Sequence, residues 1–259
     1  MRIFINTSDS DIAIETLSEL TDISAKLGFE TVDDITIADM IISIGGDGTF
    51  LKSSRKSQGK PIIGINTGTL GYLTEINPEN IENALQNILD GNYRIEKRMM
   101  LEGEIIKQSG EVSEIPPALN EIGISKNAFG IVRFDVTVNG KLINSYTADG
   151  MLVCTPTGST AYNLSCGGPI IDPTAQIITL TPIAPHSIIN RSIVLSEDSS
   201  VEIKITELRE NTSAYVLYDG CPIEIFNGDK IRIKKSEKIT KIIKLQDRSF
   251  IDTIRENIN

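Results

Sequence analysis

The sequence predicts an α/β domain followed by a mainly antiparallel β domain, and two observations carry this prediction. In the N-terminal part, the apolar runs at residues 41–44 and 62–65 flank a segment rich in Lys, Ser and Arg, so buried strands alternate with a helix. Beyond these strands, the spacing of apolar side chains changes from helical to alternating. We therefore expect a Rossmann-like parallel sheet in residues 1–95 and a β-rich domain in residues 96–259, with residues 240–259 able to pack back onto the first domain.

The first domain is expected to begin with a short strand at residues 3–5 and a helix over residues 10–27. This helix has apolar side chains at helical spacing, and a serine and a glycine flank it, as is typical of helix ends. Asn77-Pro78-Glu79 combines a cap, a proline and an acid, and predicts the start of a further helix that Gly91 ends. The apolar stripe of that helix comprises Ile81, Ala84, Leu85 and Ile88.

The second domain is predicted to consist of antiparallel strands. Apolar and polar residues alternate over residues 132–138 before Asn139-Gly140, a strong signal for a type I′ hairpin turn. Further strands are expected at residues 201–205, 214–217 and 231–234, with a turn at Asn227-Gly228. The closing residues 250–255 are weakly helical.

Composition excludes several classes of function. With 40% hydrophobic residues, 23% charged residues and a net charge of −10, the chain resembles a folded globular protein and has no basic cluster that could follow a nucleic-acid backbone. Cys154, Cys166 and Cys221 lack the spacing of a zinc site or a disulfide framework. No apolar run approaches the length of a signal peptide or membrane span. We expect a cytoplasmic protein that binds neither nucleic acid nor membranes.

The residues Gly45-Gly46-Asp47-Gly48-Thr49 place a carboxylate inside a turn between a buried strand and a helix. Glycines permit close approach of a ligand, and the N–H groups of a helix start attract phosphate oxygens. An acid among anions repels them unless it holds a metal or takes a proton, so Asp47 is interpreted as a general base or Mg²⁺ ligand in phosphoryl transfer. The turn alone leaves open that Asp47 only caps the helix.

A second glycine-rich block occupies residues 155–170. It combines several hydroxyl side chains with the ring of Tyr162, and Gly and Pro tie them into irregular backbone. Many hydrogen-bonding groups beside one stacking face suit a nucleoside. Taken alone, the block could also be a long polar turn in a β domain.

Together these segments resemble the NAD kinase family over most of the chain. The other marks of the resemblance are Asn66-Thr67-Gly68, Leu70-Gly71-Tyr72, Asn120-Glu121, Ala148-Asp149-Gly150 and residues 182–187. Diacylglycerol and sphingosine kinases share the Gly-Gly-Asp-Gly-Thr turn, whereas the second block after an Asn-Glu pair is specific to NAD kinases. The resemblance implies transfer of a phosphoryl group from ATP or polyphosphate to the adenosine ribose 2′-hydroxyl of NAD, giving NADP, with Mg²⁺ or another divalent metal.

The resemblance also implies roles for single residues. Asp47 is expected to orient or deprotonate the 2′-hydroxyl. The residues expected to bind donor phosphates are Gly45, Gly46, Gly48, Thr49 and Arg55, although Arg55 could instead pair with a neighbouring acid. The residues expected to bind NAD are Asp47, Gly48, Tyr72, Asn120, Glu121, Asp149, Thr160, Ala161, Tyr162, Ser165 and Ala184. The metal ligands stay open, and Asn120-Glu121 alone could be a solvated turn.

Two positions depart from the family pattern. Thr147 stands where many relatives have arginine, which puts the affinity for NAD and the choice between NAD and NADH in doubt. Ser192 replaces the usual proline and is expected to affect backbone stiffness more than chemistry. The single histidine, His186, is interpreted as structural.

The resemblance further implies a homo-oligomer, a dimer or tetramer, with the β domains in contact. Two alternatives to the kinase reaction on NAD are a lipid kinase, which would need a broad apolar pocket, and a non-catalytic dinucleotide sensor. Neither the phosphoryl donor, the use of NADH nor feedback regulation follows from the sequence.

Overall fold

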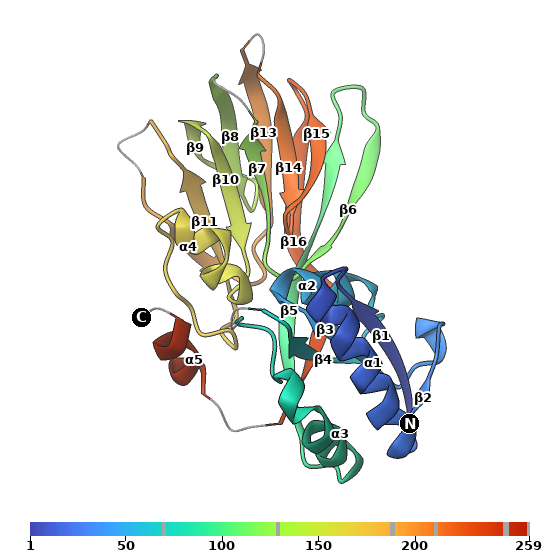
Figure 1. Ribbon diagram of the computed structural model, residues 1–259. Helices are drawn as coiled ribbons and strands as arrows, with labels where there is room; N and C mark the ends of the chain where they lie inside the picture. The colour runs from blue at the N-terminus through green and yellow to red at the C-terminus, as the bar shows by residue number, and fades with distance from the viewer. Residues whose placement is uncertain (69–70, 128–129, 187–189, 210–211, 246–248, 258–259) are drawn as a thin grey trace. The chain divides into compact units, whose positions relative to one another are not determined.

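The computed structural model describes residues 1–68, 71–127, 130–186, 190–209, 212–245 and 249–257 (Figure 1). The chain divides into two compact units: unit 1 comprises Met1–Arg98 and Ile239–Asn259, and unit 2 comprises Met99–Lys238. Two long strands, β5 (Arg94–Ile106) and β16 (Lys230–Lys244), run from one unit into the other. Leu70 and Ser187, which belong to the family marks, lie outside the described residues.

Unit 1 is built on a parallel sheet. Its strands are β1 (Arg2–Thr7), β2 (Glu30–Thr31), β3 (Met40–Gly45) and β4 (Pro61–Asn66), in the order β2-β1-β3-β4, and the end of β16 pairs in parallel with β4. Every residue of β3 is buried, as expected of a central strand covered on both faces. The carboxyl ends of β3 and β4 therefore lie side by side, where open α/β sheets bind ligands.

Helices follow these strands where the sequence predicts them. They are α1 (Asp11–Lys26), α2 (Asp47–Lys56), α3 (Ile81–Leu89) and α5 (Phe250–Asn257), with 3₁₀ turns η1 (Ile35–Ile37) and η2 (Pro78–Asn80). The Ser10 side chain caps α1 by accepting the N–H of Ala13. The helical segment predicted to start at Asn77 begins there with one 3₁₀ turn, η2, and the α-helix itself begins at Ile81. The four apolar residues predicted for the stripe of α3 are all buried.

Unit 2 consists mainly of antiparallel strands in two sheets. In the first sheet, β16 and β5 are joined by β6 (Val112–Ala118), β8 (Val132–Val138), β9 (Lys141–Ala148) and β13 (Val201–Leu208). The second sheet has the order β12-β11-β10-β7-β14-β15 and comprises β7 (Glu121–Lys126), β10 (Gly150–Cys154), β11 (Ile177–Ile183), β12 (Ile193–Ser196), β14 (Ala214–Tyr218) and β15 (Cys221–Ile225). Apolar side chains from both sheets form one core. The predicted fold class is confirmed.

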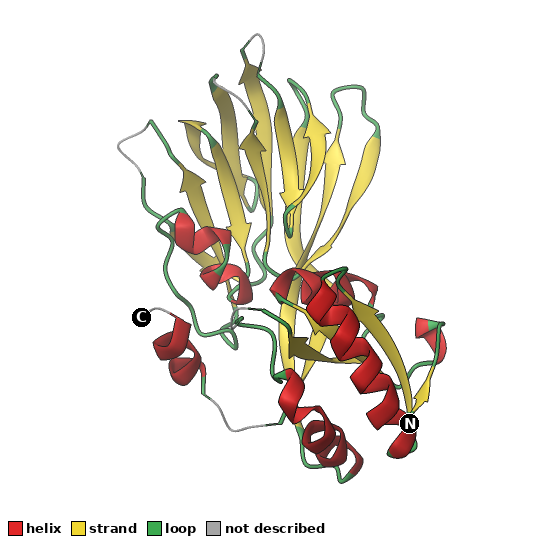
Figure 2. Cartoon of the chain, viewed as in Figure 1, coloured by secondary structure: helices red, strands yellow, loops and turns green. Residues whose placement is uncertain are grey.

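Two details of unit 2 bear on the site. Asn139 and Gly140 both have positive φ, at 49° and 76°, so the predicted hairpin turn between β8 and β9 is confirmed. Figure 2 shows most helices in unit 1, while unit 2 carries a short helical segment formed by η3 (Thr157–Thr160) and α4 (Tyr162–Ser165). This segment belongs to the second glycine-rich block.

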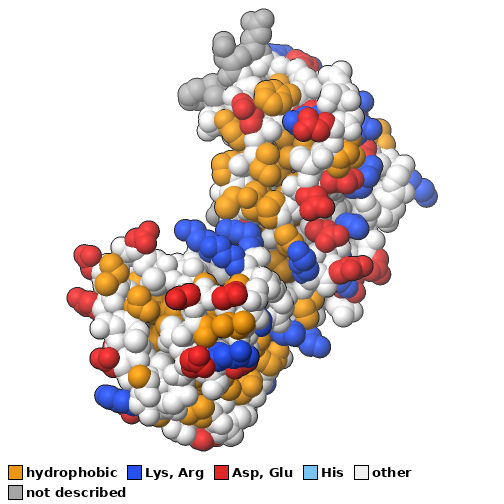
Figure 3. Space-filling model, turned by 90° about the vertical axis from the view of Figure 1, so that its right-hand side faces the viewer, with side chains coloured by type: hydrophobic (Ala, Val, Ile, Leu, Met, Phe, Trp, Pro, Cys, Tyr) orange, Lys and Arg blue, Asp and Glu red, His pale blue; other side chains and the backbone are white. Residues whose placement is uncertain are grey.

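The surface carries charges of both signs. On the face seen in Figure 3, acidic and basic side chains are intermixed, with hydrophobic side chains exposed between them. Some of these opposite charges form ion pairs between neighbouring strands of unit 2; for example, the Nζ of Lys234 lies 3.2 Å from the Oε1 of Glu102. In the part of the chain that the structure describes, no helix has the length and apolar character needed to span a membrane.

Candidate functional site

The glycine-rich turn of unit 1 joins β3 to α2. Gly45 ends β3 with a φ of +149°, and a Cβ at this position would lie 2.4 Å from the Oγ1 of Thr49. Gly46 is the N-cap of α2 and has no side chain that could accept the N–H groups of the first turn. The N–H of Thr49 donates to the C=O of Gly46 at 3.0 Å, while the N–H groups before it, at the positive end of the helix dipole, point to where an anion such as a phosphate can bind.

Asp47 is the first residue of α2 and is half-buried. Its Oδ2 accepts the backbone N–H of Tyr72 at 2.9 Å, and its Oδ1 accepts the N–H of Leu73 at 3.1 Å. A Cβ at Gly71 would lie 2.2 Å from Oδ1, so this close approach requires glycine. Each carboxylate oxygen has a second lone pair, which leaves Asp47 able to accept a hydroxyl proton or contact a cation.

The structure thus brings together two predicted segments of unit 1 that are about 25 residues apart, Asp47 and Gly71-Tyr72. Burial, together with the charge of Asp47, raises the pKa of the Tyr72 hydroxyl. Asn66 shapes the intervening loop, since its side chain bonds both the N–H and the C=O of Gly68 at 3.2 and 3.1 Å. Asn66 is buried and is interpreted as a structural residue of this loop.

Arg55 lies elsewhere on the same helix. It is in the last turn of α2, about 10 Å along the helix axis from Gly48 at 1.5 Å per residue. It also has an interaction within the protein. The backbone therefore does not place Arg55 at the glycine turn, and its role as a phosphate ligand stays a prediction.

Asn120 and Glu121 lie at the start of β7 in unit 2 and are only 8% and 5% exposed. They do not form a solvated turn, so that alternative is wrong. Among the described residues, the Oε2 of Glu121 has no hydrogen-bond partner. Burial, reinforced by the charge of Asp219, raises the pKa of Glu121 to about 8. A buried acceptor without a partner is rare in folded proteins and is typical of a site that a polar ligand completes.

The second glycine-rich block folds against this pair. Thr155 donates its N–H to the C=O of Asn120 at 2.9 Å and its hydroxyl to the C=O of Leu119 at 2.6 Å. Gly158 in turn donates its N–H to the Thr155 hydroxyl, and a Cβ at Gly158 would lie 2.2 Å from the C=O oxygen of Asn120. The block is therefore an ordered lining of the Asn120-Glu121 segment.

Tyr162 begins α4 and exposes 38% of its surface, which leaves a ring face for stacking. Burial and the nearby Cys166 and Asp149 raise the pKa of its hydroxyl. Burial and Glu121 likewise raise the pKa of the Cys166 thiol. In unit 2, electrostatic interactions therefore link Glu121 to Cys166, Cys166 to Tyr162, and Tyr162 to Asp149.

The other predicted residues of unit 2 lie on backbone that this block and β11 position. Thr160 ends η3, Ala161 separates η3 from α4, and the exposed Ser165 ends α4. Ala184 follows β11 with a φ of +41°, which is uncommon for a residue other than glycine and is found mainly at turns and functional sites.

The structure explains the two departures from the family pattern in part. Ser192 places its Oγ 2.9 Å from the Oγ1 of Thr181, and Thr181 donates to the Oδ1 of Asn163 at 2.6 Å. The serine thus joins a hydrogen-bond network that a proline could not enter. The C=O of Thr147 accepts the N–H of His186 at 2.8 Å, which agrees with a structural role for this histidine segment.

Sequence reasoning missed two charged residues of unit 2. The Nζ of Lys126 lies 2.7 Å from the Oδ1 of Asp149 and supplies a cation beside that acid. The buried Asp219 accepts the N–H groups of Leu119 and Asn120. An Asp-Gly dipeptide after a strand signals only a turn, so the sequence contains no sign of this contact.

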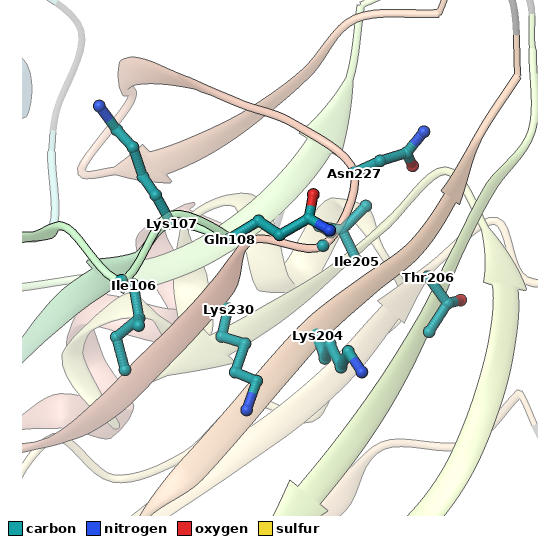
Figure 4. Close-up of a pocket in the computed structure, with 10 residues that line it drawn as sticks. Ile106, Lys107, Gln108, Lys204, Ile205, Thr206, Asn227 and Lys230 are labelled. Atoms are coloured by element: carbon teal, nitrogen blue, oxygen red, sulfur yellow. The ribbon is translucent and has the colours of Figure 1, made fainter.

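A separate cavity of about 710 Å³ in unit 2 contains none of the predicted site residues (Figure 4). Its charged lining residues are Lys107, Lys204 and Lys230. In Figure 4, Lys204 and Lys230 extend to the same side, while Lys107 points away from them. Lys107 pairs with Glu111 at 3.0 Å, and Lys230 lies 3.9 Å from Glu202. We interpret this cavity as a solvated polar groove.

Comparisons with known proteins agree with these segments. A model of the ATP-NAD kinase N-terminal domain matches residues 11–93, and one of the C-terminal domain matches residues 119–245. An NAD kinase of Caldanaerobacter subterraneus subsp. tengcongensis is 41% identical over 245 residues, 91% of this chain and 86% of the relative. An NAD kinase of Lachnospira eligens is 40% identical over 235 residues, 85% of this chain and 80% of the relative.

Two solved structures share the fold. An NAD kinase from Archaeoglobus fulgidus in complex with ATP is 27% identical, with a TM-score of 0.83 over 99% of both chains. A yeast NADH kinase complexed with NADH is 22% identical, with a TM-score of 0.93 over 100% of this chain and 87% of the yeast chain.

Proposed function

The chain belongs to the NAD kinase family, and we propose that it transfers the γ-phosphoryl group of ATP to the adenosine ribose 2′-hydroxyl of NAD, giving NADP. Both family domains match in order and span most of the chain. The structural observation that carries the proposal is Asp47, a carboxylate that two backbone N–H groups hold at the open start of α2. The matches give no support to a lipid kinase.

Asp47 is proposed to act as the general base. The bond from the 2′-oxygen to the γ-phosphorus forms while the bond from the γ-phosphorus to the bridging oxygen of ADP breaks, and the hydroxyl proton passes to Asp47. Phosphoryl transfer needs positioning and charge stabilisation more than covalent chemistry. The N–H groups of Gly46 and Gly48 and the side chain of Thr49 are proposed to bind the donor phosphates, and the helix dipole favours the phosphate charge.

Unit 2 is proposed to bind the dinucleotide. The unpartnered Glu121 Oε2 and the buried Asn120 amide suit the vicinal hydroxyls of a ribose. The half-exposed ring of Tyr162 suits an adenine face. Asp149, held by Lys126, is proposed to contact the nicotinamide end together with Ala184. Thr160, Ala161 and Ser165 are the other proposed NAD ligands of unit 2, and Tyr72 is a proposed NAD ligand of unit 1.

A kinase reaction with ATP uses a divalent metal, and we propose Mg²⁺. Among the described residues, no cluster of three or more His, Cys, Asp and Glu side chains could hold a metal by itself. Mg²⁺ commonly binds one or two protein carboxylates and completes its octahedral shell with substrate phosphates and water. Asp47 fits that pattern, because both its oxygens keep a free lone pair. Bound there, the ion would neutralise charge on the phosphates.

A homo-oligomer, a dimer or tetramer with contacts through unit 2, is also proposed. Large apolar side chains of unit 2 are exposed on its strands and turns, including Leu142 at 63%, Phe226 at 57% and Val194 at 55%. Such side chains gain stability when a second subunit covers them. Light scattering that gave a monomer mass at micromolar concentration would contradict this proposal. A cytoplasmic location stays a prediction from composition.

The direct test measures NADP formation from NAD with ATP and Mg²⁺, read by an NADP-specific dehydrogenase. Radiolabelled ATP offered with NAD and diacylglycerol in one tube separates the two kinase reactions. We expect label only in NADP. Label in the lipid, or binding of NAD without turnover, would refute the proposed reaction, and polyphosphate in place of ATP identifies the donor.

A further inference from the structure

The turn between β14 and β15 reaches back to the proposed NAD site. Asp219 in this turn accepts the N–H of Leu119 on Oδ2 at 2.9 Å and the N–H of Asn120 on Oδ1 at 2.7 Å. Its own N–H donates to the C=O of Glu121 at 3.1 Å. Three consecutive residues at the start of β7 are thus bonded to one aspartate that lies about 100 residues away in the sequence.

A preference of the turn for this residue type does not explain the contact. Asp219 and Gly220 have φ values of +45° and +78°, as in a type I′ turn, which favours Asp or Asn before Gly. Asn139-Gly140 forms the same kind of turn, and the Asn139 side chain accepts the N–H of Ser200, 61 residues away, but this bond lies at an exposed edge. Asp219 differs in being buried and in bonding the segment that carries the proposed NAD ligands Asn120 and Glu121.

The Asn120-Glu121 segment is held from two sides. Thr155 bonds the C=O groups of Leu119 and Asn120, while Asp219 bonds their N–H groups. The two contacts together fix the peptide planes from which the Asn120 and Glu121 side chains extend. The Thr155 side of this arrangement belongs to the proposed nucleotide lining, and the Asp219 side supplies orientation of the backbone and a negative charge beside Glu121.

We propose that Asp219 is a positioning residue for NAD, which fixes Asn120 and Glu121 in the geometry that binds the dinucleotide. This inference rests on the proposed function. The groups that face Glu121 and titrate or carry charge are Asp219 from the β14–β15 turn, Cys154 from β10 and Cys166 after α4. Burial first, and then Asp219, raises the pKa of Glu121 to about 8. Removing the charge of Asp219 lowers that pKa.

The test compares Asp219→Asn with the wild-type enzyme. Asparagine suits a type I′ turn, so the hairpin is retained, while the charge and one acceptor oxygen are lost. At pH 9, where Glu121 is largely ionised in both proteins, we expect the KM for NAD to rise about tenfold, with the KM for ATP unchanged and kcat within about threefold. In the wild type, the KM for NAD falls as the pH rises through about 8. In Asp219→Asn, we expect the KM for NAD to fall at a lower pH than in the wild type, because Glu121 then ionises at lower pH.

Asp229→Asn is the matched control. Asp229 is also a buried aspartate in a hairpin turn, and it also accepts two backbone N–H groups, those of Phe226 at 2.9 Å and Gln108 at 3.2 Å. It lies between β15 and β16, away from the proposed NAD ligands. We expect Asp229→Asn to lose thermal stability to a similar degree as Asp219→Asn, with the KM for NAD and its pH profile unchanged.

Asp219→Glu separates orientation from charge and serves if Asp219→Asn does not fold. It keeps the charge but displaces the carboxylate by one methylene, so the KM for NAD should rise while the pH profile stays near that of the wild type. A wild-type KM for NAD at pH 9 in either variant would overturn the inference. Failure of the wild-type enzyme to form NADP would instead refute the proposed function.

Discussion

Asp47 in unit 1 and Glu121 in unit 2 are both carboxylic acids at proposed substrate sites, and the fold surrounds them in opposite ways. Asp47 is half-buried, and two backbone N–H groups bond its two oxygens. Glu121 is almost fully buried, one of its oxygens has no partner among the described residues, and burial with a neighbouring acid raises its pKa to about 8. Hydrogen bonds to the charged form favour a carboxylate, whereas burial without them favours the neutral acid.

This difference in hydrogen bonding and burial agrees with the role proposed for each residue. A base in phosphoryl transfer must be held in place before the substrate arrives, and the N–H groups of Tyr72 and Leu73 hold the carboxylate of Asp47. A binding residue can instead gain its hydrogen bonds from the ligand, and Glu121 lacks a partner for this reason. The four predictions that follow test this contrast, those on activity and binding from the largest expected effect to the smallest, and then one on stability.

Asp47→Asn tests the base directly. We expect kcat to fall by about 10²-fold or more, because the amide keeps the size of the side chain but cannot take the hydroxyl proton. NAD binding measured by calorimetry should persist. Asp11→Asn is the control, since Asp11 is likewise an acid in the first turn of a helix, is exposed and is not among the proposed site residues. Near-normal turnover in Asp47→Asn would remove Asp47 from the mechanism.

Tyr162→Ala and Asn120→Ala test the binding side of the contrast. Each should weaken NAD binding by about 1–3 kcal/mol, the loss expected for an aromatic face or a buried polar partner. Tyr93→Ala is a matched control for the tyrosine, because Tyr93 is 39% exposed against 38% for Tyr162 and lies in unit 1. Calorimetry on folded protein that gave the wild-type affinity in both site variants would refute the proposed NAD pocket.

Gly71→Ala tests whether the backbone around Asp47 holds it in a productive position. The added methyl group would lie 2.2 Å from the Oδ1 of Asp47, so the carboxylate must move. We expect kcat to fall about tenfold, an effect of misplacement that leaves the base itself in place. Gly68→Ala belongs to the same loop and meets nothing within 4 Å, so it should keep wild-type kcat. Equal kcat in both variants would show that Asp47 tolerates displacement.

The glycine turn could be predicted from sequence because its contacts are local. The strand, the turn and the helix follow one another within residues 40–56, and the glycines are required by approaches such as that of Gly45 to Thr49. The two-domain fold class likewise follows from the periodicity of apolar residues. One boundary was wrong, at Asn77, because cap signals do not distinguish a 3₁₀ turn from the first turn of an α-helix.

The environment of Glu121 could not be predicted, because distant segments create it. Asp219 raises its pKa from a turn that local chemistry marks only as a hairpin, and Cys154 is its partner in the strand register. The solvated-turn reading of Asn120-Glu121 failed for the same reason. From the sequence, replacement of proline by Ser192 was expected to affect mainly the stiffness of the backbone. In the structure, the Ser192 hydroxyl also bonds the hydroxyl of Thr181. Such contacts depend on tertiary packing, which the periodicity of one sequence does not specify.

The last effect concerns stability and pH rather than activity, and it follows from the buried state of Glu121. The native pKa, about 8, lies above the unfolded value, about 4.3, so the native state binds the proton more tightly. Ionisation of the buried Glu121 therefore does not lower the free energy of unfolding below about pH 4.3. As the pH rises from there toward 8, the free energy of unfolding falls progressively, and above about pH 8 the loss is constant. Glu121→Gln, which cannot ionise, lacks this loss.

The measurement is the difference in Tm between Glu121→Gln and the wild type across pH 5 to 9, with no nucleotide present. Titrating groups that do not interact with Glu121 contribute equally to both proteins and cancel in the difference. We expect the Tm of the variant to rise relative to that of the wild type by on the order of 10 °C across this range, since each pH unit between the two pKa values is worth about 1.4 kcal/mol and about 1 kcal/mol shifts Tm by about 2–4 °C in a chain of this size. A difference that stays constant from pH 5 to 9 would mean that Glu121 ionises normally, and the contrast with Asp47 would then be one of hydrogen bonding alone.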